Sequence, residues 1–271
     1  MYENNLYHAQ ADAQRALVLA ETDSPFSIAI QFAGGLTQSQ MDAFAAAADR
    51  WVKVIVGDLP DVVIDGVAID DVLVVAAGAD IDGPGGILGQ AHVTHRRRPG
   101  PEPWALLPAR GEMTFDKADL ARMETAGTLR DVITHEMGHV IGVGSLWADK
   151  GFLSEVTTGD PRFTGPGAVA EYQKLHGGSD TVPVENIGGP GTARVHWREH
   201  DFGNELMTGF VNSAPNPLSR VTVASLGDLG YQVDVDAADA YELPAVAGLV
   251  EATSRVSYHN LSVSVEPTAK A

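Results

Sequence analysis

The stretch Thr128–Gly144 reads TLRDVITHEMGHVIGVG and contains the pattern H-E-x-x-H at His135, Glu136 and His139. On an α-helix, positions i and i+4 lie on one face, so both histidine rings can reach the same ion, and zinc is the metal typical of this pattern. Glu136 would then lie beside the metal, where a carboxylate can take a proton from water as a general base. An ordinary amphipathic helix can also carry these residues by chance, so the motif needs support from the rest of the chain.

The composition predicts a globular protein with its own core. The chain has 271 residues, of which 44% are hydrophobic and 20% charged, and its formal net charge of −18 argues against nucleic acid or an anionic membrane surface as a partner. The sequence contains no cysteine, which excludes disulfides, thiolate ligands and cysteine nucleophiles, so a metal must be held by His, Asp or Glu.

The sequence also bears on localisation. Residues 1–23 lack the apolar core of a signal peptide, and no apolar run approaches the roughly 18 residues that a membrane-spanning helix needs. We therefore expect no membrane insertion, and we expect any export signal to lie outside this sequence.

The chain before the H-E-x-x-H helix predicts an α/β layer. We expect a peripheral helix over Glu3–Ala20, and a long amphipathic helix that begins with a capping box formed by Thr37 and Gln40. The expected strands are Phe26–Phe32, the continuous apolar run Val72–Ala77, Ile87–Thr94 and Gly111–Asp116.

The H-E-x-x-H helix has predicted start and stop signals. Thr128 and Asp131 have the spacing of a second capping box, although Asp131 could instead orient His135. Gly142 and Gly144 are expected to end the helix, because glycine accepts the left-handed conformation of a C-cap. The following segment, from Ser145 to Pro217, is rich in glycine and proline and shows little periodicity.

Two later segments have a recognisable pattern. Leu218–Leu229 predicts a helix that ends at Gly230, and Leu249–Val265 reads as strand without an assignable position.

Aspartates are dense in the first third of the chain and raise the question of a calcium site. They lack the spacing of an EF-hand loop, so solvated turn residues are the preferred interpretation and calcium stays a secondary hypothesis. The residues are Asp61, Asp65, Asp70, Asp71, Asp80 and Asp82.

The third metal ligand cannot follow the helix at the usual distance. A catalytic zinc usually has three protein ligands, and in the longer pattern H-E-x-x-H-x-x-G-x-x-H the third histidine comes three residues after the glycine. Gly142 is in place here, but the ligand position is Ser145. Either the third ligand is lost, or it comes from farther along the chain, where the histidines are His176, His196, His200 and His259.

His196 is the preferred candidate. A glycine-rich bend precedes it and Trp197 follows it, an arrangement that can deliver an imidazole with an aromatic ring packed behind it. His176 reads as a surface residue, and His259 lies in the tail.

Taken together, these blocks resemble the leishmanolysin family of metzincin zinc peptidases, in which an insertion separates the helix from the third histidine. The matching blocks, within roughly residues 110 to 245, are His135–Gly142 (HEMGHVIG), Gly191–Trp197 (GTARVHW), Asn204–Gly209 (NELMTG) and Leu226–Tyr231 (LGDLGY).

The resemblance implies a set of roles at the site. The zinc ligands would be His135, His139 and His196, with Glu136 as the base. Met207 would lie in a turn after the third ligand and provide the hydrophobic surface under the metal. Gly142 would let the chain turn beneath the metal at the end of the helix.

The resemblance also implies an α+β fold: a twisted, mostly parallel sheet with two long helices in residues 1–144, an irregular part in residues 145–271, and the cleft between them. Metzincins commonly pair substrate with an antiparallel edge strand, for which Ile87–Thr94 is the best candidate.

The chain departs from the family pattern in two respects. Without cysteine it can have neither the disulfides nor the cysteine latency switch of eukaryotic members. Some metzincins place a tyrosine two residues after the turn methionine, whereas Gly209 stands here, so transition-state charge should fall mainly on zinc.

We therefore predict a zinc metalloendopeptidase that acts on polypeptides, secreted or at the cell surface, with one catalytic zinc. One alternative is a non-catalytic zinc- or calcium-binding adhesion module on a peptidase scaffold, against which the presence of Glu136 weighs. The other is a hydrolase of small amides, which a blind pocket would favour.

Overall fold

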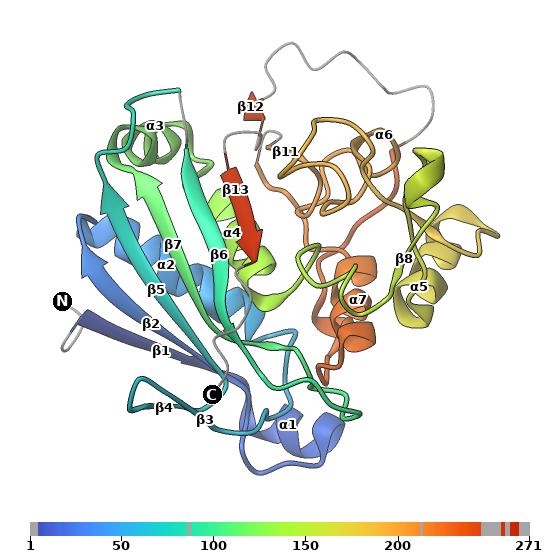
Figure 1. Cartoon of the computed structure of the whole chain (residues 1–271), viewed down its shortest axis with the longest axis horizontal. Helices are drawn as coiled ribbons and strands as arrows, with labels where there is room; N and C mark the ends of the chain where they lie inside the picture. The colour runs from blue at the N-terminus through green and yellow to red at the C-terminus, as the bar shows by residue number, and fades with distance from the viewer. Residues whose placement is uncertain (1–4, 86–87, 212–213, 245–255, 258–260, 266–271) are drawn as a thin grey trace.

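The protein folds as α+β around one mixed six-stranded sheet, as the sequence predicts for the class (Figure 1). The computed structural model describes residues 5–85, 88–211, 214–244, 256–257 and 261–265. In the order in which they pair, the strands are β1 (Leu6–Gln10), β2 (Ser27–Gly34), β5 (Val72–Ala79), β7 (Pro108–Asp116), β6 (Gly89–Arg96) and β13 (Leu261–Val265).

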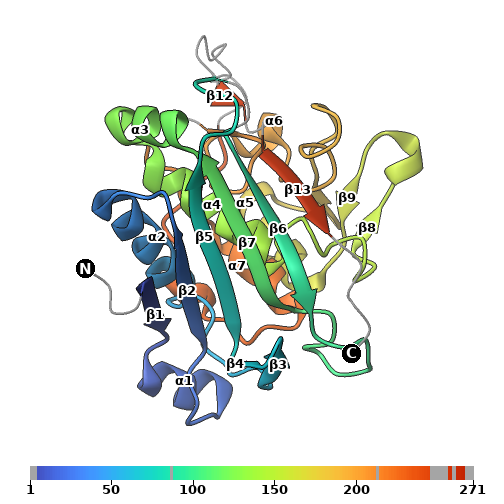
Figure 2. The ribbon, with the colours of Figure 1, turned by 60° about the vertical axis from the view of Figure 1, so that its left-hand side comes forward.

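The sheet is twisted, as Figure 2 shows, but it is less uniformly parallel than expected. The pairs β2–β5, β5–β7 and β6–β13 are parallel, whereas β1–β2 and β6–β7 are antiparallel. The apolar run in β5 lies between two parallel neighbours, which confirms its prediction as an interior strand.

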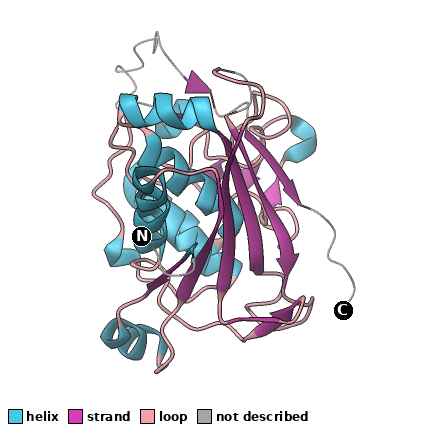
Figure 3. Cartoon of the chain, turned by 90° about the vertical axis from the view of Figure 1, so that its left-hand side faces the viewer, coloured by secondary structure: helices cyan, strands magenta, loops and turns pink. Residues whose placement is uncertain are grey.

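Two long helices cover one face of the sheet, α2 (Gln38–Trp51) and α4 (Leu129–Ile141), the latter being the H-E-x-x-H helix (Figure 3). The indole of Trp51 donates to the Thr134 carbonyl at 2.9 Å and so joins the two helices. A Cβ at Gly111 of β7 would lie 3.0 Å from the carbonyl oxygen of His92 and would collide with Val140. The missing side chain therefore lets α4 pack closely against the sheet.

The N-terminal prediction is partly wrong. Instead of one helix over Glu3–Ala20, the chain forms edge strand β1, which pairs with β2, and then α1 (Ala13–Ala20). Asp12 accepts a hydrogen bond from the Arg15 backbone and caps α1, so the helix starts only after the strand has ended. Backbone pairing with β2 outweighs the helix propensity of these residues.

Only one of the two predicted capping boxes exists. At α2, Thr37 accepts from the Gln40 backbone and the Gln40 side chain accepts from Thr37, as expected. Thr128 has helical dihedrals (φ −99°, ψ −8°) and makes no side-chain cap hydrogen bond. An additional helix, α3 (Lys117–Ala126), which was not predicted, ends at left-handed Gly127. The Thr128 amide donates to the Met123 carbonyl at 3.0 Å and so belongs to the end of α3.

Apart from β13, the described residues that follow α4 lie mostly on the far side of this helix from the sheet (Figure 1). This part of the chain is less irregular than expected, since it contains α5 (Pro166–His176), the short α6 (Glu199–Phe202) and the predicted α7 (Arg220–Leu229), which ends at left-handed Gly230. The remaining short elements are β3 (Val62–Ile64), β4 (Val67–Ile69), β8 (Leu153–Ser154), β9 (Arg162–Phe163), β10 (Val182–Pro183), β11 (Phe210–Val211), β12 (Val256–Ser257) and the 3₁₀ turns η2 (Val156–Thr158) and η3 (Val235–Ala237).

Strand β6 corresponds to the predicted substrate edge, but its outer side is already paired. Residues Leu261–Val265 of β13 run parallel to Gly89–Val93, so β6 is not a free edge in this structure. Ile87, where the predicted strand began, lies outside the described residues. Within the described part of the chain, no helix is long and apolar enough to cross a membrane.

Replacing Thr37 with alanine should lower the free energy of unfolding by about 1 kcal/mol, because α2 loses a capping hydrogen bond. Thr128→Ala is the matched control. It removes the same hydroxyl from a helix start that does not use it, and its effect should stay within about 0.5 kcal/mol. Urea unfolding followed by circular dichroism measures both, and equal losses would contradict the assignment of the caps.

Candidate metal centre

Three histidine rings meet in the interior between α4 and the segment that follows α5. The Nε2 atom of His139 lies 2.9 Å from that of His135 and 3.0 Å from that of His196, and the remaining Nε2 pair is 3.1 Å apart. Their ligand atoms form one of the two groups among the described residues that could hold a metal ion, and all three side chains are buried. The expected distant partner of the helix histidines is thus close enough to share an ion.

The hydrogen bonds on the other ring nitrogens fix the direction of the lone pairs. Each Nδ1 faces a backbone carbonyl: Leu206 at 2.7 Å from His135, Val143 at 2.8 Å from His139 and Thr192 at 2.9 Å from His196. A carbonyl only accepts, so Nδ1 carries the proton and each Nε2 presents a lone pair to the other two.

This donor set fits zinc. Three inward lone pairs with no proton between them repel one another unless a cation lies among them. Tetrahedral zinc with Zn–N bonds of 2.0–2.1 Å places its ligands about 3.3 Å apart, close to the separations found here. Carbonyls behind metal-binding imidazoles are the usual orienting partners.

Glu136 lies beside the three histidines, and no other described residue forms a hydrogen bond with its carboxylate. Its Oε1 atom is 3.6 Å from Nε2 of His135, and both carboxylate oxygens are buried without a hydrogen-bond partner among the described residues. Burial raises the pKa of Glu136 to about 8 in the metal-free chain. A buried carboxyl kept free of partners is costly, and such a cost is typical of a functional group.

The end of α4 explains how a ligand so far away in sequence reaches the site. Gly144 has φ +73°, and a Cβ there would collide with the carbonyl oxygen of Val195, the neighbour of His196. Ser145, at the position of the missing ligand, donates to the His139 carbonyl at 2.7 Å. The chain after the helix therefore packs directly against the backbone that carries the third ring.

The segment that carries His196 is a turn held from both sides by backbone hydrogen bonds, with isolated β-bridges from Trp197 to Val184 and to Thr208. The Trp197 amide donates to the Met207 carbonyl at 3.0 Å on one side, and the Glu185 amide donates to the His196 carbonyl at 2.9 Å on the other.

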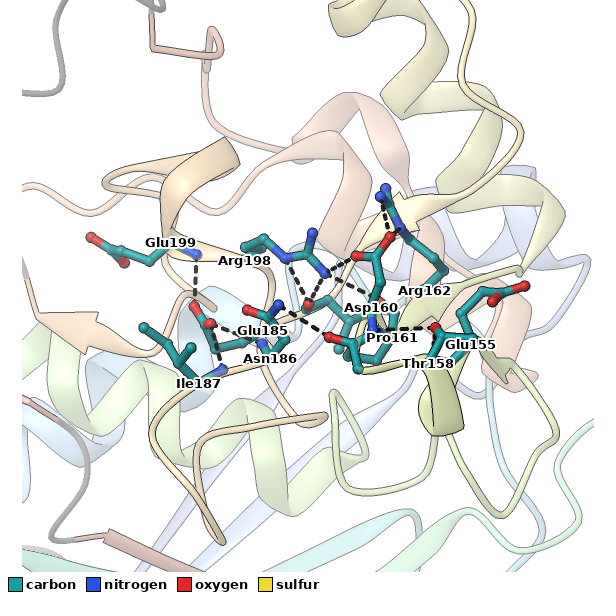
Figure 4. A network of polar contacts seen from close by, with 12 residues as sticks. Glu155, Thr158, Asp160, Pro161, Arg162, Glu185, Asn186, Ile187, Arg198 and Glu199 are labelled. Atoms are coloured by element: carbon teal, nitrogen blue, oxygen red, sulfur yellow. Dashed lines mark hydrogen bonds and ion pairs between the residues drawn. The ribbon is translucent and has the colours of Figure 1, made fainter.

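Glu185 and Arg198 brace this arrangement (Figure 4). The buried carboxylate of Glu185 accepts from the backbone of Asn186, Ile187 and Glu199 at 2.9–3.1 Å. The Arg198 guanidinium donates to the Val184 carbonyl and pairs with Asp160 at 2.7 Å.

The methionine of the turn packs under the helix. A Cβ on Gly138 would lie 2.8 Å from Sδ of Met207 and 2.9 Å from the Trp51 ring, so Met207 touches the backbone of α4 between the two helix histidines. Met207 itself is fully buried. Trp197, the residue after His196, packs against Trp147 with centroids 4.3 Å apart.

The remaining candidate residues lie elsewhere. His176 and His200 are exposed and outside the histidine cluster, and His259 is not among the described residues. Asp131 neither caps α4 nor orients His135. It accepts from the backbone and side chain of Asn216 at 2.9 and 2.8 Å and so ties α4 to the loop before α7.

The acidic turns bring Asp58, Asp70 and Asp71 together. Asp71 is already satisfied, because it accepts from the Leu59 and Ser27 backbone amides and the Ser27 hydroxyl. These contacts agree with the prediction that the aspartates hold turns, and they do not support a calcium site.

Comparison with known proteins decides the family. The leishmanolysin model of the peptidase M8 family matches residues 104–250, more than half of the chain and the whole of the centre just described. The chain belongs to the leishmanolysin family.

A curated relative of this leishmanolysin-family chain is a leishmanolysin homolog from Crithidia fasciculata. It is 29% identical over 108 residues, which cover 36% of this chain and 16% of the relative. The chain thus spans well under a fifth of that protein's length.

Gly144→Ala should cost more stability than Gly151→Ala and should also weaken zinc binding. Both glycines have almost the same positive φ, +73° and +75°, but only Gly144 has backbone in the way of a Cβ. Gly151→Ala measures the conformational cost alone, about 1–2 kcal/mol.

Urea unfolding and zinc titration compare the two variants. The added collision must displace Val195 and with it His196, so an affinity for zinc that is equal in the two variants would contradict the close approach.

In the metal-free protein the buried histidines should lower the free energy of unfolding as the pH falls below about 6.5, whereas Glu136, with its pKa raised to about 8, should increase it over the same range. Burial lowers the pKa of His135 well below its usual value and that of His139 to about 3, and the neighbouring rings add to both shifts. The unfolded chain therefore binds these protons first, at a cost of up to about 1.4 kcal/mol per pH unit for each histidine.

Unfolding midpoints at pH 7 and 5.5 after chelation measure this cost. Because Glu136 is present in both proteins, the comparison isolates the histidine: relative to the parent, His139→Gln should be more stable at pH 5.5 than at pH 7, and an identical pH dependence in the two proteins would rule out the histidine contribution.

Proposed function

We propose that this leishmanolysin-family chain is a zinc-dependent endopeptidase of the metzincin type. The observation that carries the proposal is the buried group of three inward-facing Nε2 atoms with the Glu136 carboxylate beside it, which has no hydrogen-bond partner among the described residues. His135, His139 and His196 would hold the zinc. When bound, zinc supplies a Lewis acid that polarises the scissile carbonyl and makes water more acidic.

Glu136 would act as the general base and then as the general acid. Its carboxylate takes a proton from the attacking water and delivers it to the nitrogen of the leaving amine, so the peptide C–N bond breaks and the carboxylate returns to its starting state. The pKa of about 8 belongs to the metal-free chain. A nearby dication favours the ionised form that a base requires.

The other residues of the site would position these groups. Met207 packs against Gly138 and supports the helix beneath the ligands. A Cβ on Gly209 would lie 2.8 Å from Thr192, so that position has no room for a tyrosine, and the developing negative charge would rest mainly on the metal.

Polypeptide is the proposed substrate, approached through a cleft between residues 1–144 and 145–271, and the proposed location is the cell surface or the outside of the cell. A substrate strand that used the outer edge of β6 would have to displace β13, which pairs there in this structure.

Glu136→Gln should retain zinc and lose turnover. The amide keeps the volume of the side chain but cannot take a proton, so hydrolysis of casein should fall by about 10²- to 10⁴-fold. Zinc content by atomic absorption and casein hydrolysis are measured on the same preparation. His196→Ala is the comparison, since it should lose the metal as well as the activity. Full hydrolysis by Glu136→Gln would refute the proposed mechanism.

The same assay separates the two alternatives from the sequence analysis. A zinc-loaded parent protein that cleaves neither casein nor small amides would be a binding module. One that cleaves only small amides would be a metallohydrolase with a restricted site.

A further inference from the structure

Glu205 is a second buried carboxylate near the centre, and neither the family motif nor the proposed chemistry uses it. It is fully buried, and four groups donate to its carboxylate. The Met207 amide reaches Oε2 at 2.5 Å, while the Ser219 amide, the Ser219 hydroxyl and the Thr222 hydroxyl reach Oε1 at 3.1, 2.8 and 2.5 Å. The carboxylate thus joins the methionine turn to the start of α7.

One line of hydrogen bonds leads from Glu205 to the third histidine. The indole Nε1 of Trp197 donates to the Thr222 hydroxyl at 2.7 Å, and that hydroxyl donates onward to Glu205. The direction is fixed because an indole only donates and a carboxylate only accepts. Trp197 directly follows His196 in the chain, so this line of hydrogen bonds from Glu205 fixes the side chain next to the third ligand.

A second line leads to a helix histidine. The hydrogen bond from the Met207 amide holds the Glu205–Met207 turn, and the carbonyl within that turn belongs to Leu206. That carbonyl accepts the Nδ1 proton of His135 at 2.7 Å. The position of the carbonyl decides which way the His135 lone pair points.

We propose that Glu205 is the positioning residue of the metal centre, which it shapes from two sides: through Leu206 to His135, and through Thr222 and Trp197 to His196. The inference rests on the proposed zinc site. It predicts that Glu205 controls zinc affinity and coordination geometry without touching the metal.

These four hydrogen bonds require both side-chain oxygens of Glu205 to act as acceptors. Burial raises the pKa of Glu205, while the four donors act in the opposite direction. A glutamine could keep one oxygen for the three donors at Oε1, but its amide hydrogens would then face the Met207 amide. Glu205→Gln is therefore a nearly isosteric change that breaks one defined contact in the turn.

The test compares Glu205→Gln with Asp71→Asn. Asp71 is also a buried carboxylate that accepts from two backbone amides and a hydroxyl, but it lies between β2 and β5, away from the histidines. Both variants should lose stability. Only Glu205→Gln should weaken zinc binding, by about 10- to 100-fold in competition with a chromogenic chelator.

Cobalt provides a second readout that a purely structural role would not change. The visible absorption of Co²⁺ in the site should shift in position and intensity in Glu205→Gln and stay as in the parent in Asp71→Asn, because only the first change moves the ligands.

Thr222 tests the line to Trp197 separately and keeps the inference testable if Glu205→Gln does not fold. Thr222→Val removes the hydroxyl that connects Trp197 to Glu205 and should weaken zinc binding by about 10-fold. Thr222→Ser retains a hydroxyl and should bind zinc as the parent does.

Parent-like zinc affinity and cobalt spectra in both Glu205→Gln and Thr222→Val would overturn the inference, as would an equal loss of affinity in Asp71→Asn. A parent protein that binds no zinc would overturn the proposed function itself.

Discussion

The whole centre depends on one electrostatic constraint: three imidazole lone pairs pointing at one another in the protein interior. Such an arrangement is unfavourable without a cation, and it persists here because a backbone carbonyl fixes each ring from behind. Those carbonyls belong to three separate stretches, at Leu206, Val143 and Thr192. The three imidazoles can therefore share one ion only when the tertiary structure places all three of these carbonyls correctly.

Glycine makes these close approaches possible. A side chain at Gly138 would push Met207 and Trp51 away from α4, and one at Gly144 would exclude the backbone beside His196. Both positions lie within or next to the H-E-x-x-H turn of the helix. The space that they leave is occupied by Trp51, by Met207 and by the backbone of Val195, so the later segments reach the backbone of the helix and of the turn that follows it.

Buried glutamates stabilise this second half in a chain without cysteine. Glu185 accepts from three backbone amides beside the segment that carries His196, and Glu205 accepts from two amides and two hydroxyls at the methionine turn. A buried carboxylate with several donors is stable only when every donor stays in place. Each therefore fixes a loop conformation that regular secondary structure does not provide.

The sequence by itself determined the main strands and the helix with His135, Glu136 and His139, because apolar periodicity and i, i+4 spacing are properties of a single element. The α+β class and the places of His196 and Met207 came from the resemblance of four separate motifs to a family, which no single local pattern supplies. Only the tertiary structure decided that β1 is a strand, that Thr128 caps nothing and that Asp131 holds Asn216. It also decided the part played by Glu205, because that role depends on contacts with residues 14 and 17 positions away in α7 and its cap, which no local pattern encodes.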